Sequence, residues 1–421
     1  MTKSKLILTP KLRFPEFRDK PGWDDTVLGN VLTEHGEKND GVSEVHSVSV
    51  HKGVVNQIEH LGRSFAAADR SKYNLAKPHD VIYTKSPTGD FPYGIVKQNQ
   101  NPYNVIVSPL YGVFSPENRH LGYILDCYFE SPIRTCKYLA PITQKGAKNT
   151  IQISNATFLS KSIYLPSIPL EQQKIADCLN SLDGLIVAES RKLEALKTHK
   201  KGLMQQLFPQ PGQTQPRLRF PEFRDKRAWI SDPLGKIFET SSGGTPERSV
   251  AMYWNGKIPW ISTELINFNI ICKANEFISE IGLKNSSAKL FPIGTVLVAM
   301  YGQGKTRGKV AVLAIEATTN QACAAILPLD KIYPYFVFQN LAGRYDEMRG
   351  LSNSGGQENL SQELIKGIKF SYPNDINEQR TIANCLSALD AQIAAQVAKI
   401  DALKTHKRGL MQQLFPSPEE Q

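Results

Sequence analysis

Apolar residues recur at alternating steps of three and four in two long stretches of the chain. This spacing places them on one side of an α-helix and forms the seam of a coiled coil. The two seams consist of Leu179, Leu182, Ile186, Leu193, Leu196, Leu203 and Leu207, and of Leu386, Leu389, Ile393, Ile400, Leu403, Leu410 and Leu414. Polar residues interrupt both seams at matching steps, namely Glu189 and Lys200 in the first and Gln396 and Lys407 in the second. Such polar positions could fix the register of a helix pair.

The two stretches predict helices of about 38 residues, each about 57 Å long. Pro169 and Asn377 stand near their starts, and Pro209 and Pro416 end them. We expect the helices to occupy residues 168–208 and 375–416 and to pair with each other, antiparallel, with one domain at each end of the pair. The alternative is that each helix packs separately on its own domain.

Short apolar runs bounded by glycine, proline and asparagine lie outside these helices. They include Asp80–Thr84, Tyr103–Val107, Gly294–Met300 and Lys309–Ile315, and such runs are typical of β-strands. Each region between the helices is therefore predicted to be a mixed α/β unit built around an antiparallel or mixed sheet. The predicted fold class of the whole chain is α+β.

An internal repeat organises the chain. LRFPEFRDK occurs at Leu12–Lys20 and again at Leu218–Lys226, and LKTHKKGLMQQLFP at Leu196–Pro209 returns at Leu403–Pro416 with a single difference, Lys201 against Arg408. The regions between these strings share little identity. Nearly identical flanking segments around unlike central regions indicate that the flanks share one structural role and the central regions have two different specificities. The sequence at the end of the second half matches the sequence at the end of the first half, so the two halves could also be drawn as a circle.

The repeat sets the predicted domain boundaries. Residues 1–167 form a first variable domain, 168–208 the first helix, 209–215 a Pro/Gly/Gln-rich linker, 216–374 a second variable domain, and 375–416 the second helix.

Composition narrows the class of protein. The chain has 421 residues, 41% hydrophobic and 21% charged, which excludes disorder and collagen-like repetition. Its net charge of +10 permits a polyanionic partner. The six cysteines form no C-x-x-C pair, so we expect free thiols in a reducing cytoplasm rather than a zinc site or a disulfide framework. No signal peptide or membrane span is expected.

One glycine-rich run imitates a nucleotide site. Ala299–Thr306 follows a strand and fits a relaxed P-loop, but a β-like run at Lys309–Ile315 follows it where a P-loop needs a helix. A hairpin tip is the better prediction. An enzyme, either a P-loop NTPase using Lys305 or a methyltransferase, and a coiled-coil scaffold that binds only protein remain the alternatives.

Several strings of the second half form one joint pattern. They are Ser242–Pro246, Tyr253–Trp254, Ile258–Ser262, Gly294–Lys309, Ala317–Gln321 and Gly356–Ser361, followed by the run Asn377–Pro416. The first six strings resemble a target recognition domain of the specificity subunit of type I restriction-modification systems, and the last run resembles the spacer of that family. The first variable domain matches more loosely, through Gly146–Thr150 and the run to Pro166.

The resemblance implies a non-catalytic DNA-binding subunit. Each of two target recognition domains would read one half of a split, asymmetric site in double-stranded DNA, and the helices would set their separation and dock two methyltransferase subunits. Restriction and translocase subunits would complete the assembly. The chain itself would hold no cofactor or metal; S-adenosylmethionine, ATP and Mg would belong to partner subunits.

Loop position and donor chemistry select the candidate DNA-binding residues. These are Lys85, Lys145, Lys148 and Asn149 in the first domain, and Thr245, Gln303, Lys305, Arg307, Gly356 and Gln357 in the second. Amide and cationic donors of this kind suit base edges and phosphates. Arg307 is expected to contact a base or a phosphate.

Overall fold

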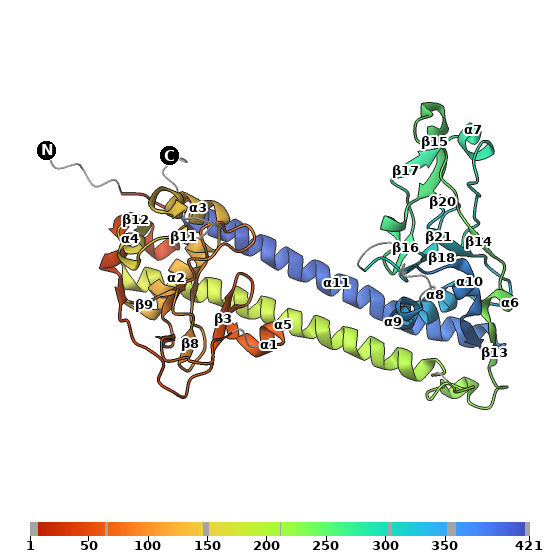
Figure 1. Cartoon of the computed structure of the whole chain (residues 1–421), viewed down its shortest axis with the longest axis horizontal. Helices are drawn as coiled ribbons and strands as arrows, with labels where there is room; N and C mark the ends of the chain where they lie inside the picture. The colour runs from red at the N-terminus through yellow and green to blue at the C-terminus, as the bar shows by residue number, and fades with distance from the viewer. Residues whose placement is uncertain are drawn as a thin grey trace. The chain divides into compact units, whose positions relative to one another are not determined.

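The computed structural model describes residues 7–63, 66–145, 151–210, 212–301, 305–351 and 359–416. The chain divides into two compact units, Met1–Glu189 with Lys399–Gln421, and Ser190–Ala398. Each unit contains one variable region and a part of both long helices (Figure 1). None of the described helices is both long and apolar enough to cross a membrane.

The first unit is built around a four-stranded antiparallel sheet in the order β2-β9-β6-β7. Its strands are β2 (Leu32–Glu34), β6 (Val81–Tyr83), β7 (Val96–Gln98) and β9 (Gly112–Pro116), and the smaller ladders pair β1 (Asp24–Val27) with β12 (Ser162–Leu165), β3 (His46–Ser49) with β4 (Gly53–Asn56), β5 (Asn74–Ala76) with β8 (Val105–Val107), and β10 (Gln144–Lys145) with β11 (Ile151–Gln152). Its short helices are α1 (Gln57–Leu61), α2 (Arg119–Phe129), α3 (Pro132–Leu139) and α4 (Asn155–Leu159).

The second unit contains a five-stranded sheet in the order β14-β21-β18-β19-β16, in which only the β16–β19 pair is parallel. Its strands are β14 (Thr240–Ser242), β16 (Asn269–Ile271), β18 (Val296–Ala299), β19 (Val310–Leu313) and β21 (Cys323–Ile326); a three-stranded sheet joins β15 (Trp254–Ile261), β17 (Glu276–Ile278) and β20 (Thr318–Thr319), and β13 (Ile230–Pro233) pairs with β22 (Lys369–Tyr372). Its short helices are α6 (Leu234–Ile237), α7 (Glu280–Lys284), α8 (Pro334–Gly343), α9 (Tyr345–Gly350) and α10 (Gln362–Gly367).

Both faces of this five-stranded sheet are covered, which explains why its strands read as unbroken apolar runs. Alternate residues of a strand point to opposite faces. Val296 and Val298 of β18 join the core that includes Phe336 of α8, whereas Leu297 and Ala299 join a second cluster with Ile261 of β15.

The long helices are α5 (Pro169–Leu207) and α11 (Ile376–Leu414), close to the predicted ranges 168–208 and 375–416. Every residue of the two predicted seams is buried or half-buried, including the polar positions Glu189, Lys200, Gln396 and Lys407. In the first unit Lys407 bonds Asp183 at 2.9 Å and Lys399 bonds Glu189 at 2.5 Å. The partner of Lys407 is Asp183 of α5, and the partner of Lys399 is Glu189, so lower residue numbers on one helix face higher numbers on the other. The two helices are therefore antiparallel in this unit.

A buried carboxylate fastens each variable region to the start of its long helix. Glu171 accepts bonds from Arg13 Nε at 2.7 Å, Arg13 Nη2 at 2.8 Å and Trp23 Nε1 at 3.2 Å. Glu378 accepts the equivalent bonds from Arg219 and Trp229. Both carboxylates are almost wholly shielded from water, so the planar guanidinium must pair with them in bidentate fashion. The repeated LRFPEFRDK string supplies this arginine in each half.

The same string also meets the end of a long helix. Leu12 N donates to Gln413 O at 3.0 Å in the first unit, and Leu218 N donates to Gln206 O at 2.9 Å in the second. In the second unit the linker joins the two bonded segments, whereas in the first unit they lie near opposite ends of the chain. The repeated string therefore makes the same backbone contact with the end of a long helix in both units.

Removing one anchor carboxylate should destabilise its unit strongly. Glu171→Ala or Glu378→Ala leaves a buried guanidinium without its anion, and breaking a buried pair costs about 3 to 5 kcal/mol. Urea unfolding followed by tryptophan fluorescence measures this, because Trp23 and Trp229 contact the two carboxylates. Glu16→Ala is the control, since Glu16 pairs with Lys174 on the surface. Equal midpoints for the anchor and control variants would contradict the anchoring role.

Candidate nucleic-acid interface

The glycine-rich run of the second unit ends in a hairpin turn. Lys305–Gly308 forms turns between the antiparallel strands β18 and β19, and Gly308 has φ +83°, which a residue with a side chain adopts only under strain. The predicted hairpin tip is confirmed. Since Lys305 is followed directly by the turn and strand β19, and not by a helix, it lacks the N-terminal helix amides that a P-loop uses to hold phosphate.

Arg307 occupies a different place from the one predicted. Only 5% of its surface is exposed, and Nη2 donates to Arg349 O of α9 at 3.0 Å. A guanidinium turned into the protein in this way holds the turn against α9 instead of presenting its donors to a base. The loop position and donor chemistry of Arg307 could not reveal this, because α9 begins about 40 residues further along the chain.

Helix α9 supports the same turn through a second contact. Tyr345 OH donates to Lys305 O at 2.6 Å, which fixes the backbone of Lys305 while its side chain remains exposed. Phe268, which has φ +54°, packs edge-on against Tyr345 with ring centroids 5.2 Å apart. The turn therefore offers a cation on a backbone that its neighbours hold in place.

Thr245 lies where three of the resembling strings meet. A Cβ added to Gly243 would lie 2.1 Å from Thr319 O, so this glycine is required by a close approach of backbones. Trp260 Nε1 donates to Gly244 O at 3.0 Å, and Thr245 Oγ1 donates to Gln321 Oε1 at 2.7 Å. The hydroxyl and amide of Thr245 and Gln321 thus lie side by side near the surface.

In the first unit Lys85 is held in an unusual backbone conformation. Its φ is +53°, and a Cβ on Gly94 would lie 2.9 Å from Lys85 N. Burial lowers the pKa of its ammonium, an effect that the charge of Glu34 partly opposes. Lys85 borders a small polar hollow of about 120 Å³ with Glu34 and Asn155.

Of the remaining candidate DNA-binding residues, the structure describes only Lys145. Lys145 lies on β10, opposite Ile151 of β11. Lys148, Asn149, Gln303, Gly356 and Gln357 lie outside the described residues. Among the described residues, no group of three or more His, Cys, Asp or Glu side chains is placed to hold a metal ion, and all six cysteines are free thiols.

Comparison with known proteins assigns the family. The model of the type I restriction modification DNA specificity domain matches residues 56–198 and 227–405, which is most of the chain. The chain belongs to this family. The two matched segments correspond to the two halves of the repeat, so each half carries its own specificity domain.

Curated relatives and solved structures agree with this assignment. Over 163 residues the chain is 29% identical to the specificity subunit of the EcoR124I/EcoR124II type I restriction enzyme of Escherichia coli, and over 168 residues it is 30% identical to that of the MjaIX enzyme of Methanocaldococcus jannaschii. The matched stretches cover 37% and 38% of this chain, and 40% and 38% of the two relatives. The chain thus spans about two fifths of the length of these relatives.

The fold itself is shared more widely. The type I S subunit from M. genitalium matches 97% of this chain and 100% of its own with a TM-score of 0.61 at 16% identity. A chain from a study of assembly and conformational transition in a type I system matches 94% of this chain and 98% of its own with a TM-score of 0.54 at 17% identity.

Lys305 and Arg307 should respond differently to replacement by alanine. Lys305 is predicted to contact a phosphate, so its loss should weaken DNA binding equally on all sequences and reduce the slope of log K against log salt by about 0.9. Arg307→Ala should instead lower the free energy of unfolding by about 1 to 3 kcal/mol, because the half-buried Arg349 carbonyl loses this donor. Salt titrations by fluorescence anisotropy, combined with urea unfolding, separate the two effects.

Lys192→Ala is the control for these variants, since Lys192 is an exposed cation of α5 remote in sequence from the turn. Unchanged stability in Arg307→Ala, together with relaxed preference at one base pair, would restore the base-reading role for Arg307.

Proposed function

We propose that the chain is the DNA specificity subunit of a type I restriction-modification complex and reads a split, asymmetric site in double-stranded DNA. The observation that carries this proposal is that the sequence repeat forms the same attachment between variable region and long helix in both units. Two unlike variable regions are fastened by the same arginine, glutamate and tryptophan to the starts of two long helices of equal length and related sequence. Because the attachment is the same and the attached regions differ, each variable region would recognise a different half of the DNA site.

The helices would serve as the spacer between the readers. Their seams and the bond between Lys399 and Glu189 support an antiparallel coiled coil with one recognition domain at each end. A helix pair is stiff over this length, so the number of residues between the domains would fix the number of base pairs between the half-sites.

Catalysis would belong to other subunits. Two methyltransferase subunits would dock on this chain and methylate adenine with S-adenosylmethionine, and restriction/translocase subunits would use ATP and Mg. The family match supports this division, and the hairpin turn after Lys305 removes the main reason to expect nucleotide binding in this chain. Six free thiols are consistent with a cytoplasmic protein.

Binding to DNA should depend steeply on salt. Each phosphate contact releases counterions, so about six contacts give a slope of log K against log salt of about −5. Anisotropy measurements of the full chain with its methyltransferase on duplex DNA, over a series of salt concentrations, test this. A flat response would favour the scaffold that binds protein alone.

Lengthening the spacer should lengthen the gap in the DNA site. One heptad added to both helices, at the level where Glu189 faces Lys399, adds about 10 Å, or about three base pairs. Three base pairs also rotate one half-site around the duplex, whereas a heptad turns the helix by only about 20°, so affinity should fall. Selection from a random DNA library, with the methyltransferase present, should return both half-sites with the longer gap.

The matched control inserts the same seven residues into the 209–215 linker, which should leave the gap unchanged. An unchanged gap in the helix variant, with both half-sites retained, means that the helices do not set the spacing.

A further inference from the structure

The same helix end lies in different surroundings in the two units. In the first unit Lys407 Nζ is 2.8 Å from Glu130 Oε2 and 2.8 Å from Asp183 Oδ1. Arg134 Nη2 donates to Met411 O at 2.9 Å, and its guanidinium lies 4.9 Å from the ring centroid of Phe415. Burial disfavours the charged form of Lys407, but Cys127, Glu130 and Asp183 together outweigh it and raise the pKa. Glu130, the residue that follows α2, and Arg134, in the first turn of α3, therefore cover this helix end.

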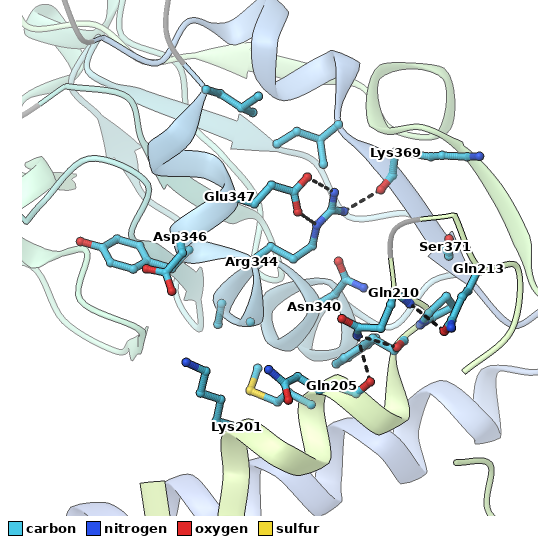
Figure 2. Close-up of a pocket in the computed structure, with 18 of the residues that line it drawn as sticks. Lys201, Gln205, Gln210, Gln213, Asn340, Arg344, Asp346, Glu347, Lys369 and Ser371 are labelled. Atoms are coloured by element: carbon cyan, nitrogen blue, oxygen red, sulfur yellow. Dashed lines mark hydrogen bonds and ion pairs between the residues drawn. The ribbon is translucent and has the colours of Figure 1, made fainter. Parts of the chain in front are cut away.

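In the second unit the equivalent residues line a cavity of about 990 Å³, called here the α5 pocket (Figure 2). Lys200, Met204 and Phe208 occupy the positions of Lys407, Met411 and Phe415. Lys200 bonds Asp390 at 2.5 Å, the counterpart of Asp183, and no second carboxylate of a described residue pairs with it. Met204 O accepts the helical bond of Phe208 N and, among the described residues, no guanidinium.

The path of the chain after α8 explains the difference. α2 and α8 contact their helix pairs in the same way, because Tyr123 OH donates to Asp183 and Gln339 Nε2 donates to Asp390. α3 then turns back over the helix end, whereas α9 packs against the hairpin turn through Tyr345. The arginine that follows α8, Arg344, bonds Glu347 and Lys369 O (Figure 2). Because α9 packs against the turn at Lys305–Gly308, it does not cover the end of α5 as α3 covers the end of α11.

The α5 pocket has polar groups suited to an occupant. Asn340 is only 4% exposed, and its Oδ1 has no partner among the described residues. A buried oxygen without a donor costs about as much as a lost hydrogen bond, so a ligand that donates to it is favoured. Lys201 and Lys369 add positive charge at the border of the pocket, and Figure 2 shows both around Asn340.

We propose that the α5 pocket receives a segment of a partner protein in which a carboxylate at the end of one helix is followed, four residues later, by an arginine in the first turn of the next helix. The carboxylate pairs with Lys200 as Glu130 pairs with Lys407. The arginine donates to Met204 O and stacks over Phe208 as Arg134 does on Met411 and Phe415. The first unit thereby supplies from its own chain what the second unit takes from another molecule.

The segment that fills the first unit is the natural probe. A fluorescent peptide of residues 129–142 is titrated into the full chain. Saturable binding is expected, and it should weaken by about tenfold or more when the peptide carries E130Q or R134Q, since each removes one charged contact in a desolvated site. In the protein, Lys201→Glu and Asn340→Leu should weaken binding, whereas Arg408→Glu, the position equivalent to Lys201 in the first unit, should not.

Sequence-specific DNA binding is measured on the same variants, so that a failure of the pocket is distinguished from a failure of the proposed DNA function. Retained DNA binding also shows that Asn340→Leu is folded. No saturation up to about 1 mM peptide, equal binding of the substituted peptides, or displacement of the peptide by duplex DNA would each overturn the proposal.

Discussion

A buried carboxylate at the start of each long helix is the constraint on which the rest of the molecule depends. An anion without water must be fully paired, and Glu171 and Glu378 each achieve this with one arginine and one tryptophan brought from about 150 residues away. Pairing therefore fixes where a variable region ends and a helix begins. It also explains why the arginine-bearing string is identical in both halves while the centres differ.

Local pattern predicted the helices well, because their seams extend over many turns and proline marks their ends. The hairpin was also predictable, since a β-like run follows Thr306. The inward turn of Arg307 was not, because it depends on contact with Arg349, and no spacing rule connects a loop residue to a helix so much later in the chain. Likewise the glycines near Thr245 could be read as flexible, whereas they allow backbones to meet closely.

The two units show how one scaffold tolerates different centres. Each variable region donates one hydrogen bond to an equivalent aspartate of the long helices, Asp183 in the first unit and Asp390 in the second. The donor is a tyrosine in the first unit and a glutamine in the second. Beyond that contact the centres are free to differ. In the first unit α3 packs against the end of α11, whereas in the second unit α9 packs against the turn at Lys305–Gly308. The two units therefore use equivalent helices to hold different parts of the structure in place.

The discontinuous make-up of the first unit has a consequence for synthesis on the ribosome. The second unit is one contiguous segment, Ser190–Ala398, whereas the first needs Lys399–Gln421 as well as Met1–Glu189. Domains usually complete folding in the order in which they are made. Here the second unit can close first, while the N-terminal region waits for Met411, Leu414 and Phe415 to enter its core. A newly made chain therefore cannot complete the first unit until the C-terminal part of α11 has been synthesised.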